Sequence, residues 1–482
     1  MPASARATIH SYLPRITPEE AGLSSERIPV FLEAIRNKGI RLHTFLAAKE
    51  GRVFAEVYYP PYSPDQLQQV FSLSKSFTSI AVGLAVEEGR LKLTDRAASF
   101  FKPEELPESY DPKLNDLTVR DLLRMATGQA REQMLGPDWV KSFFLEPMAD
   151  EAGGRVFRYN TLATHLLAAV LDRCGIELES YLEERLLQPL GIGGTRWLRS
   201  PAGVCAGGFG FSAVPELIAK FGTLLLQEGR WEGKQLLPAW YIREATSKQI
   251  ETSTDPAASR TGDWAQGYGY QFWQCTHGCF RGDGMFGQFC VVSPAKKTVF
   301  AITSFTDDLQ GVLDLLYEHI LEPLADVPLP ADPDAAAALT ARLPRAEDPI
   351  PYPAPLAPTA FHRPLADRLD GKSLIDTRLN IRLSIRFEEE ELQLGWEQTV
   401  CRAKNGGWFD SAATYQGLEN TRVLTGYAFE GSDTLAVRLF FPEVMQDLLL
   451  RITPQEDEAD FHLFDVHTGQ EQPLLTSRGI LR

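Results

Sequence analysis

Ser72 and Lys75 stand three positions apart in the stretch Phe71–Phe77, and their residue types suit nucleophilic catalysis. If this stretch is helical, the two side chains lie on one face, because residues three apart are neighbours on an α-helix. A serine hydroxyl is a poor nucleophile at neutral pH until a nearby base removes its proton. A lysine amine can be this base when its surroundings lower its pKa. The spacing therefore predicts an activated Ser72 with Lys75 beside it.

The competing interpretation is that the pattern has no chemical role. Ser-x-x-Lys fixes only two positions, so it arises by chance in many helices. A lysine on the polar side of such a helix is usually just solvated. The catalytic hypothesis therefore depends on what the rest of the chain supplies.

Tyr159 is a second candidate, because it lies in Gly153–Thr161 directly before a predicted helix over Leu162–Cys174. A phenol there could exchange a proton with a serine if nearby cations lowered its pKa from about 10. The alternative is a tyrosine that packs in the core with its hydroxyl bonded to the backbone.

Gly282 and Gly284 flank Asp283 just before a strand-like run, Gly287–Val292. Glycines carry no Cβ, so the backbone at these positions can approach a ligand closely. A phosphate-binding loop is the competing interpretation. It has little support, because no Walker or dinucleotide-binding pattern surrounds these glycines.

Hydrophobic periodicity predicts the elements that hold these residues. Phe77, Ile80, Ala81, Leu84 and Ala85 form one apolar stripe, which predicts an amphipathic helix that ends at Gly89. The same spacing predicts further helices at Ser24–Asn37 (with Ser24 or Ser25 as N-cap), Leu117–Gly128, Pro215–Gly229 and Leu309–Leu321. Strand-like runs occur at Leu42–Ala48, Arg52–Tyr59, Gly267–Trp273 and Val299–Thr303.

The composition of the chain changes after Leu321. Of its 32 prolines, 11 lie between Pro323 and Pro364, which indicates a linker. From Leu379 to Phe387 apolar and polar residues then alternate, as in a half-buried strand. We expect a domain over 1–324, a linker rich in proline and alanine over 325–368 and a small antiparallel β domain over 369–482.

Composition excludes several classes of function. The chain has 482 residues, 44% of them hydrophobic, and a net charge of −16, which argues against nucleic acid or an anionic membrane as partner. No stretch approaches the ~18–20 apolar residues of a membrane helix, and the N-terminus lacks the apolar core of a signal peptide. The six cysteines are too scattered for a disulfide framework. Cys275 and Cys279 fit a hairpin turn better than a metal clip, so we expect no metal or other cofactor. The missing signal peptide and the scattered cysteines lead us to expect a cytoplasmic protein.

Three separated segments, taken in chain order, resemble one family. Ser72–Lys75, Tyr159–Thr161 and Gly282–Gly284 have the order and rough spacing of the serine β-lactamase and penicillin-binding-protein superfamily. The resemblance covers roughly Pro14 to Leu324. It is strongest to the class C-like branch, which includes esterases and D-amino-acid peptidases. It implies an α+β fold (an α/β sandwich), in which an antiparallel sheet and a helical region enclose the site.

The resemblance also implies roles for particular residues. Ser72 would attack a carbonyl carbon, with Lys75 and Tyr159 sharing the proton transfers of acylation. The backbone N–H groups of Ser72 and Met285 would form the oxyanion hole. The positions implied to bind substrate are Thr161, Gly282, Asp283 and Gly284.

The chain departs from the family pattern at two positions. The third segment usually opens with a lysine or histidine that helps to bind a substrate carboxylate, but here Gly282 and Asp283 stand there. Asp283 should repel a β-lactam carboxylate, unless the neighbouring Arg281 compensates. Thr161 occupies a position where asparagine is frequent. We therefore expect an esterase or amidase that acts on a small molecule rather than an efficient β-lactamase.

Three alternatives stay open at this point. The bond cleaved could belong to a D-amino-acid peptide or another small amide, or the chain could be a weak β-lactamase. A non-catalytic binding scaffold is the alternative from another class, since a fold alone does not fix function. An α/β-hydrolase is disfavoured because the chain has no Gly-x-Ser-x-Gly elbow. The C-terminal domain could cover the site, form a homo-oligomer or only stabilise the chain, and the loops 129–152 and 245–266 are candidates for shaping the pocket.

Overall fold

The computed structural model describes residues 4–129, 131, 135–149, 153–253, 260–397, 399–466 and 472–482. The chain divides into two compact units. The N-terminal unit comprises Ala7–Asp65 and Gln69–Asp348, and the C-terminal unit comprises Met1–Arg6, Gln66–Gln68 and Pro349–Arg482. Within the described ranges, no helix combines the length and the apolar character needed to span a membrane.

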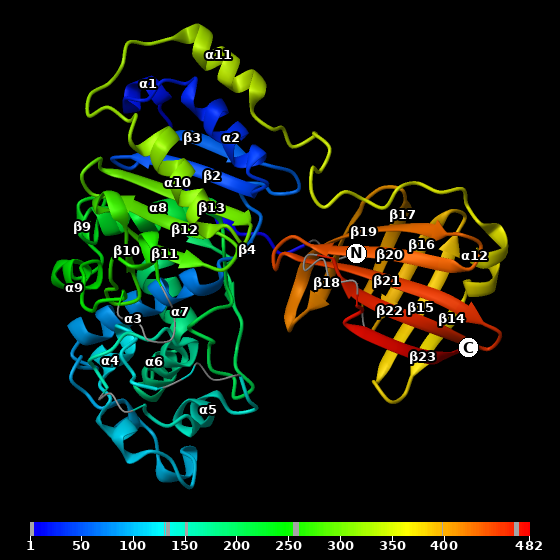
Figure 1. Cartoon of the computed structure of the whole chain (residues 1–482), viewed down its shortest axis with the longest axis horizontal. Helices are drawn as coiled ribbons and strands as arrows, with labels where there is room; N and C mark the ends of the chain where they lie inside the picture. The colour runs from blue at the N-terminus through cyan, green and yellow to red at the C-terminus, as the bar shows by residue number, and fades with distance from the viewer. Residues whose placement is uncertain are drawn as a thin grey trace. The chain divides into compact units, whose positions relative to one another are not determined.

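The N-terminal unit is built on a six-stranded antiparallel sheet with the strand order β10–β11–β12–β13–β2–β3 (Figure 1). The strands are β2 (Arg41–Lys49), β3 (Arg52–Tyr58), β10 (Trp273–Gln274), β11 (Phe280–Gly284), β12 (Gln288–Ser293) and β13 (Thr298–Phe305). The predicted strands at 42–59, 287–292 and 299–303 are confirmed, and Cys275–Cys279 forms the turn between β10 and β11. The prediction of a strand over Gly267–Trp273 is wrong except at Trp273, which is the first residue of β10. Gln271 has φ +65°, so the backbone turns there and pairing starts at Trp273.

Helices cover both faces of this sheet. On one face lie α2 (Arg27–Asn37) and α10 (Leu309–Leu316), whose apolar side chains join one core with alternate residues of β12 and β13 such as Phe289 and Phe300. On the other face lies α8 (Pro215–Leu226), in which Gly222 approaches the sheet closely. A Cβ at Gly222 would stand only 2.3 Å from a methyl group of Val299.

The predicted N-cap of α2 is wrong. Neither Ser24 nor Ser25 caps this helix, because its N-cap position is Glu26. The hydroxyl of Ser25 donates instead to the Glu19 carboxylate at 2.9 Å, and the Ser25 N–H donates to the same carboxylate at 2.7 Å. Ser25 therefore supplies hydrogen bonds to the buried Glu19 carboxylate rather than to the N–H groups at the start of the helix.

Two helices that the sequence predicts as amphipathic are buried on every side. They are α3 (Ser74–Glu87), buried from Ser74 to Ala85, and α8, buried from Pro215 to Leu225. Their polar side chains meet protein rather than water. In α8, for example, Lys220 Nζ donates to the carbonyls of Ser11 and Leu190 at 2.5 and 2.6 Å. Buried polar groups require such partners, because leaving them unpaired is costly.

A helical region lies beside the sheet, with α3 between them (Figure 1). Its helices are α4 (Val119–Leu123), α5 (Trp139–Leu145), α6 (Thr161–Arg173) and α7 (Leu178–Leu182). Thr118 is the N-cap of α4, since its hydroxyl accepts the Asp121 N–H at 3.2 Å. In α6, His165 is buried against Trp139, and its Nδ1 lies 3.2 Å from the Ala206 carbonyl oxygen.

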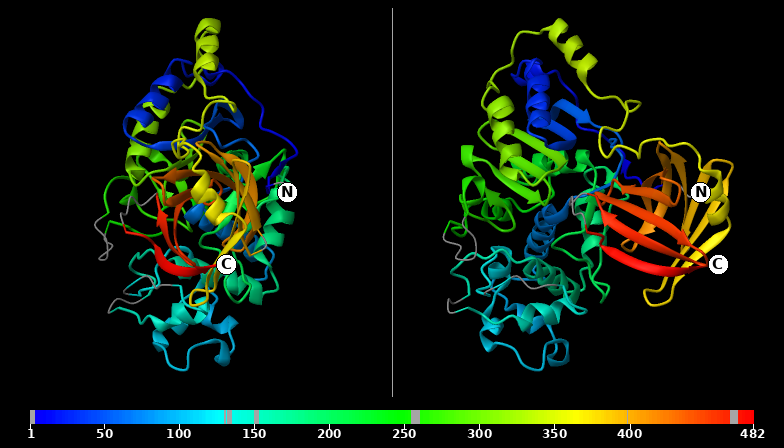
Figure 2. Two further views of the ribbon diagram at one scale, coloured as in Figure 1. Left: turned by 90° about the vertical axis from the view of Figure 1, so that its right-hand side faces the viewer. Right: turned by 45° about the vertical axis from the view of Figure 1, so that its right-hand side comes forward.

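The C-terminal unit is an antiparallel sheet of ten strands in the order β17–β16–β15–β14–β23–β22–β21–β20–β19–β18. A short pairing of β17 with β19 closes the sheet on itself, and Figure 2 shows these strands curving round a common interior. The strands are β14 (Lys372–Asp376), β15 (Ile381–Glu388), β16 (Glu391–Trp396), β17 (Thr399–Asn405), β18 (Phe409–Tyr415), β19 (Leu418–Glu430), β20 (Thr434–Phe441), β21 (Gln446–Gln455), β22 (Glu458–Asp465) and β23 (Leu475–Leu481). The expected antiparallel β domain is therefore present. The segment expected to be a linker contains two helices, α11 (Pro333–Arg342) and α12 (Arg363–Leu369).

The buried imidazole of His165 makes stability depend on pH. Burial lowers the pKa of His165 to about 4. Below about pH 6.5 the unfolded chain takes up a proton that the folded chain does not bind until near pH 4, so stability falls as the pH falls through this window. We expect the loss of unfolding free energy between pH 7 and pH 5 to be smaller in His165→Gln than in the wild type, by about 2 kcal/mol. Denaturant unfolding at the two pH values measures this difference. The exposed His10→Gln is the control, and an unchanged pH dependence in His165→Gln would contradict the prediction.

Candidate active site

Ser72 lies in a single 3₁₀ turn, Phe71–Leu73, that runs directly into α3. Phe71 has φ +47°, a left-handed conformation that is uncommon for a bulky residue. This conformation is held from both sides. The Phe71 ring meets Phe286 edge to face at 5.4 Å, and the Phe71 carbonyl accepts the Ser74 hydroxyl at 2.5 Å. The strained turn thus places Ser72 just before the first turn of the helix.

Lys75 is 1% exposed, and its side-chain nitrogen lies against Ser72. Nζ donates to Ser72 Oγ at 3.0 Å, to the Gly208 carbonyl oxygen at 2.7 Å and to Thr161 Oγ1 at 3.4 Å. The same nitrogen lies 4.9 Å from the centroid of the Tyr159 ring. The structure therefore brings together Ser72, Lys75, Tyr159 and Thr161, although they come from two separate parts of the sequence.

Tyr159 and Thr161 are positioned by the start of α6. Asn160 is the N-cap of this helix, and its amide also donates to the Gln129 side-chain oxygen at 2.8 Å. The ring of Tyr159 stacks on Trp273 with centroids 5.8 Å apart and an interplanar angle of 14°. Trp273 begins β10, so the tyrosine is held between the helical region and the sheet.

Gly282 and Gly284 allow β11 to lie directly against the turn that carries Ser72. A Cβ at Gly284 would stand 2.2 Å from the Val70 carbonyl oxygen, and one at Gly282 would stand 2.5 Å from the Ser76 hydroxyl. The close approach expected at these glycines therefore occurs, but its partner in the structure is the protein's own backbone and helix. Met285 follows the strand directly and is 58% exposed.

Asp283 and Arg281 form a buried ion pair on β11. Arg281 Nε lies 3.0 Å from Asp283 Oδ2, and the arginine side chain is 0% exposed. Its guanidinium also lies over the Trp264 ring at 4.2 Å. Burial raises the pKa of Asp283, while the charges of Arg281 and Lys75 act in the opposite direction. Because Arg281 is enclosed and already paired, it is not available to compensate for Asp283 toward a substrate carboxylate.

Several residues that shape this site carry no signal that we recognised in the sequence. Gln271 is buried; its backbone carbonyl accepts the Ser76 hydroxyl at 2.8 Å and its side chain accepts the Thr164 hydroxyl at 2.7 Å. Trp273 stacks on Tyr159, and Gly208 accepts from Lys75. For Gly208, the adjacent pair of glycines at 207 and 208 is the one local signal in the sequence.

The loops expected to shape the pocket are described only in part. Residues 130, 132–134, 150–152 and 254–259 lie outside the described residues. In the described remainder, Gln129 bonds to the N-cap of α6, and the Arg260 guanidinium lies 5.2 Å from the Trp273 ring centroid. Both loops therefore contribute side chains next to the residues around Tyr159.

A helix bearing a serine and a lysine, enclosed by an antiparallel sheet and a helical region, defines a class of α+β proteins with a β-lactamase-like architecture. The family model for beta-lactamase matches residues 37–325, which is more than half of the chain. The chain belongs to the beta-lactamase family. The resemblance to the serine β-lactamase and penicillin-binding-protein superfamily is thereby confirmed, and with it the assignment of the chain to a family of hydrolases.

Two groups of known proteins are similar to this chain. A 6-aminohexanoate-dimer hydrolase of Paenarthrobacter ureafaciens is 24% identical in an alignment 297 residues long that covers 55% of this chain and 72% of the relative. A Bacillus anthracis structure provisionally named as a hydrolase of the same kind has 19% identity and a TM-score of 0.52, covering 67% of this chain and 92% of its own. The structure of SurE has 18% identity and a TM-score of 0.50, covering 89% and 94%. At these identities the structures show the fold alone.

The close approach at Gly284 predicts a specific sensitivity. We expect Gly284→Ala to lower the free energy of unfolding by roughly 1–3 kcal/mol, because the added methyl group meets a backbone oxygen that cannot rotate away. Gly193→Ala is the matched control, since the nearest atom to its Cβ would be 3.7 Å away. Denaturant unfolding of both variants checks this. Equal stability of the two variants would show that β11 does not need the glycine.

Proposed function

We propose that this protein is a serine hydrolase that cleaves a small ester or amide through an acyl-enzyme on Ser72. The observation that carries the proposal is the 3.0 Å contact between Lys75 Nζ and Ser72 Oγ, with the lysine 1% exposed. A lysine accepts a proton only as the uncharged amine, and burial favours that form of an amine. The partners at 2.7 and 3.4 Å are neutral oxygens that hold the nitrogen in place.

In the acylation step Ser72 Oγ forms a bond to the substrate carbonyl carbon, and the hydroxyl proton passes to the Lys75 amine. The carbonyl oxygen becomes an oxyanion, for which the backbone N–H groups of Ser72 and Met285 are the proposed donors. When the carbon–nitrogen or carbon–oxygen bond to the leaving group breaks, that group takes a proton. Tyr159 delivers it and is reprotonated from Lys75, whose Nζ lies 4.9 Å from the phenol ring centroid.

In the deacylation step water replaces the leaving group. A water oxygen adds to the acyl carbon while its proton passes to the Lys75–Tyr159 pair. The bond between Ser72 Oγ and the acyl carbon then breaks, and the serine regains a proton. The products are the carboxylic acid and the restored enzyme, so no oxidant, metal or cofactor enters the balance.

The substrate we propose is a small linear amide or ester rather than a β-lactam. The relative from Paenarthrobacter ureafaciens is named for hydrolysis of the 6-aminohexanoate dimer, whose halves are joined by an amide bond, and this supports amide cleavage. The pairing of Asp283 with a buried Arg281 leaves no accessible cation from β11 for a carboxylate next to the scissile bond. Thr161 and the strand Gly282–Gly284 are the proposed substrate-binding positions.

Labelling with a fluorophosphonate probe tests whether Ser72 is activated. We expect a single adduct on the wild type by intact mass, none on Ser72→Ala, and normal labelling of Ser99→Ala, which removes an exposed serine. In Lys75→Met we expect the labelling rate to fall on the order of 10³-fold, because the proton acceptor is lost. No adduct on folded wild-type protein, together with no ester hydrolysis, would contradict the proposal and favour a non-catalytic binding scaffold.

Substrate profiling tests the bond and the charge preference. We expect turnover of p-nitrophenyl butyrate and of the 6-aminohexanoate dimer. For the β-lactam nitrocefin we expect a kcat/KM at least about 100-fold lower than for the ester, because β11 offers no accessible cation to its carboxylate. Turnover of a D-alanyl amide with an uncharged leaving group, compared with turnover of the 6-aminohexanoate dimer, separates peptidase activity from general amidase activity. Nitrocefin turnover equal to that of the ester would refute the charge argument while leaving Ser72 as nucleophile.

A further inference from the structure

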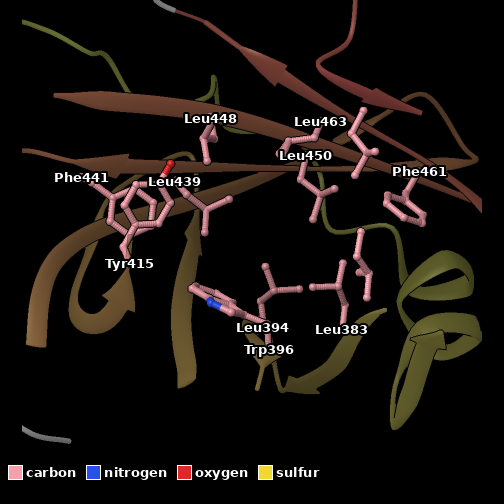
Figure 3. A pocket seen from close by; sticks show the side chains of 12 residues that line it. Leu383, Leu394, Trp396, Tyr415, Leu439, Phe441, Leu448, Leu450, Phe461 and Leu463 are labelled. Atoms are coloured by element: carbon pink, nitrogen blue, oxygen red, sulfur yellow. The ribbon is translucent and has the colours of Figure 1, made fainter. Parts of the chain in front are cut away.

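The C-terminal unit contains an apolar cavity of about 180 Å³ that is partly open to solvent (Figure 3). The cavity lies inside the closed sheet, and its lining comes from seven of the strands. All of the lining side chains are aliphatic or aromatic: Ile381, Leu383, Leu394, Trp396, Tyr415, Leu439, Phe441, Leu448, Leu450, Phe461, Leu463 and Leu475. It shares no residue with the site around Ser72, and the inference drawn from it is independent of the proposed hydrolase reaction.

Strand register shows that these residues belong to the inward face of the sheet. Leu450, Leu463 and Leu475 are direct partners across β21, β22 and β23, so their side chains point to the same side. The neighbouring residue along each of these strands points to the outer face, where Arg451 pairs with Glu430 and His462 bonds to Thr476. The cavity is therefore a consequence of the period-two pattern of the strands.

The interior is filled at one end of the sheet and hollow at the other. At the filled end Phe361 meets Phe387 and Phe429 edge to face, at 5.9 and 5.5 Å, and the α12 residues Leu365 and Leu369 are buried. At the hollow end some of the inward side chains are only partly buried, among them Ile381, Leu383, Trp396 and Leu475. Apolar surface left accessible to water forgoes about 25 cal/mol for each Å². A ligand that covered this surface would recover that free energy.

The size of the cavity fits one small organic molecule. An apolar cavity of about 150 Å³ in another protein stays dry and binds benzene. The cavity of about 180 Å³ therefore accommodates a single ring system or a saturated chain of similar bulk. Closed sheets of about this strand number leave room for one small ligand at their centre.

The chemistry of the lining selects against charge. The Tyr415 hydroxyl and the Trp396 indole nitrogen are the polar atoms that the twelve lining side chains carry. Asp465 pairs directly with Leu448 across β21 and β22 and so faces the same side as this lining residue. Burial raises the pKa of Tyr415, and the charge of Asp465 adds to the effect. Because none of the twelve lining side chains carries a positive charge, a ligand carboxylate would lose its hydration in the cavity without gaining a partner.

We propose that the C-terminal unit binds one uncharged hydrophobic molecule in this cavity. The class of ligand is a small aromatic ring system or a medium-length alkyl chain that ends in an uncharged group. Contacts with the ring of Trp396 and with the register partners Leu450, Leu463 and Leu475 supply the binding free energy. The lack of a cation among the twelve lining side chains supplies the discrimination against anions.

Titration of the full-length chain with 1-naphthylamine tests the proposal, because this uncharged probe has one fused ring system and its fluorescence emission shifts to the blue in apolar surroundings. We expect saturable binding of one probe per chain. Leu463→Trp fills the cavity and should weaken binding at least 10-fold, whereas His462→Trp places the same side chain on the outer face of the same strand and should not. If Leu463→Trp lowers the unfolding midpoint, Leu450→Trp replaces it. Binding that does not saturate, or that the cavity-filling variant leaves unchanged, would overturn the proposal.

Two further arms of the same titration test where the probe binds and which charge is tolerated. Ser72→Ala should bind the probe as the wild type does, and loss of binding in this variant would place the probe at the other site and overturn the assignment. Competition with 1-octanol should displace the probe, whereas octanoate, with the same chain length, should be at least 10-fold weaker. Equal displacement by octanoate would refute the preference for an uncharged ligand.

Discussion

The polar side of α3 has to find hydrogen-bond partners in the middle of the protein, and the N-terminal unit depends on how this is done. Ser76 and Ser79 donate to the carbonyls of Gln271 and Tyr270 at 2.8 and 2.7 Å, and Thr78 donates to Gly207 at 2.8 Å. Lys75 completes the row by donating to Gly208. Because unpaired buried polar groups are costly, the helix can occupy this position only when the segments 207–208 and 270–271 present these carbonyl oxygens. The helix and the loops therefore fix one another, and Lys75 is held beside Ser72 as part of the same arrangement.

The same constraint explains the sheet edge next to the site. The strand β11 must reach the Ser72 turn without displacing it, and Gly282 and Gly284 provide that room. Trp273 connects the edge to Tyr159, and the paired Arg281 and Asp283 fill the space behind it. The same contacts thus pack the sheet edge and position the residues of the site.

Local spacing allowed part of this to be predicted from the sequence. Ser72 in the 3₁₀ turn and Lys75 in α3 are three residues apart, and side chains at this spacing lie on one side of both kinds of helix, so their proximity follows from helix geometry. Periodicity also predicted the long helices α2, α3, α6 and α8 and the strongly alternating strand β15, whereas the strands β14, β17, β18, β19 and β23 were not predicted. The burial of α3 was predicted wrongly, because an apolar stripe does not reveal that distant carbonyls satisfy the opposite face. Gln271, Trp273 and the enclosure of Arg281 depend on packing between distant segments, which no local pattern encodes.

The pairing of β2 with β13 has a consequence for how the chain is made. Thr44 and Thr303 share a hydrogen bond of 2.6 Å across 259 residues of sequence, and β13 is the central strand that joins the early hairpin to the later strands. During synthesis the hairpin β2–β3 leaves the ribosome long before its partner exists. A two-stranded hairpin is only marginally stable on its own, and it exposes an unpaired edge while it waits. The N-terminal unit therefore completes its sheet only after β13 has been translated, and the unpaired edge of the hairpin stays exposed to non-native strand pairing during that interval.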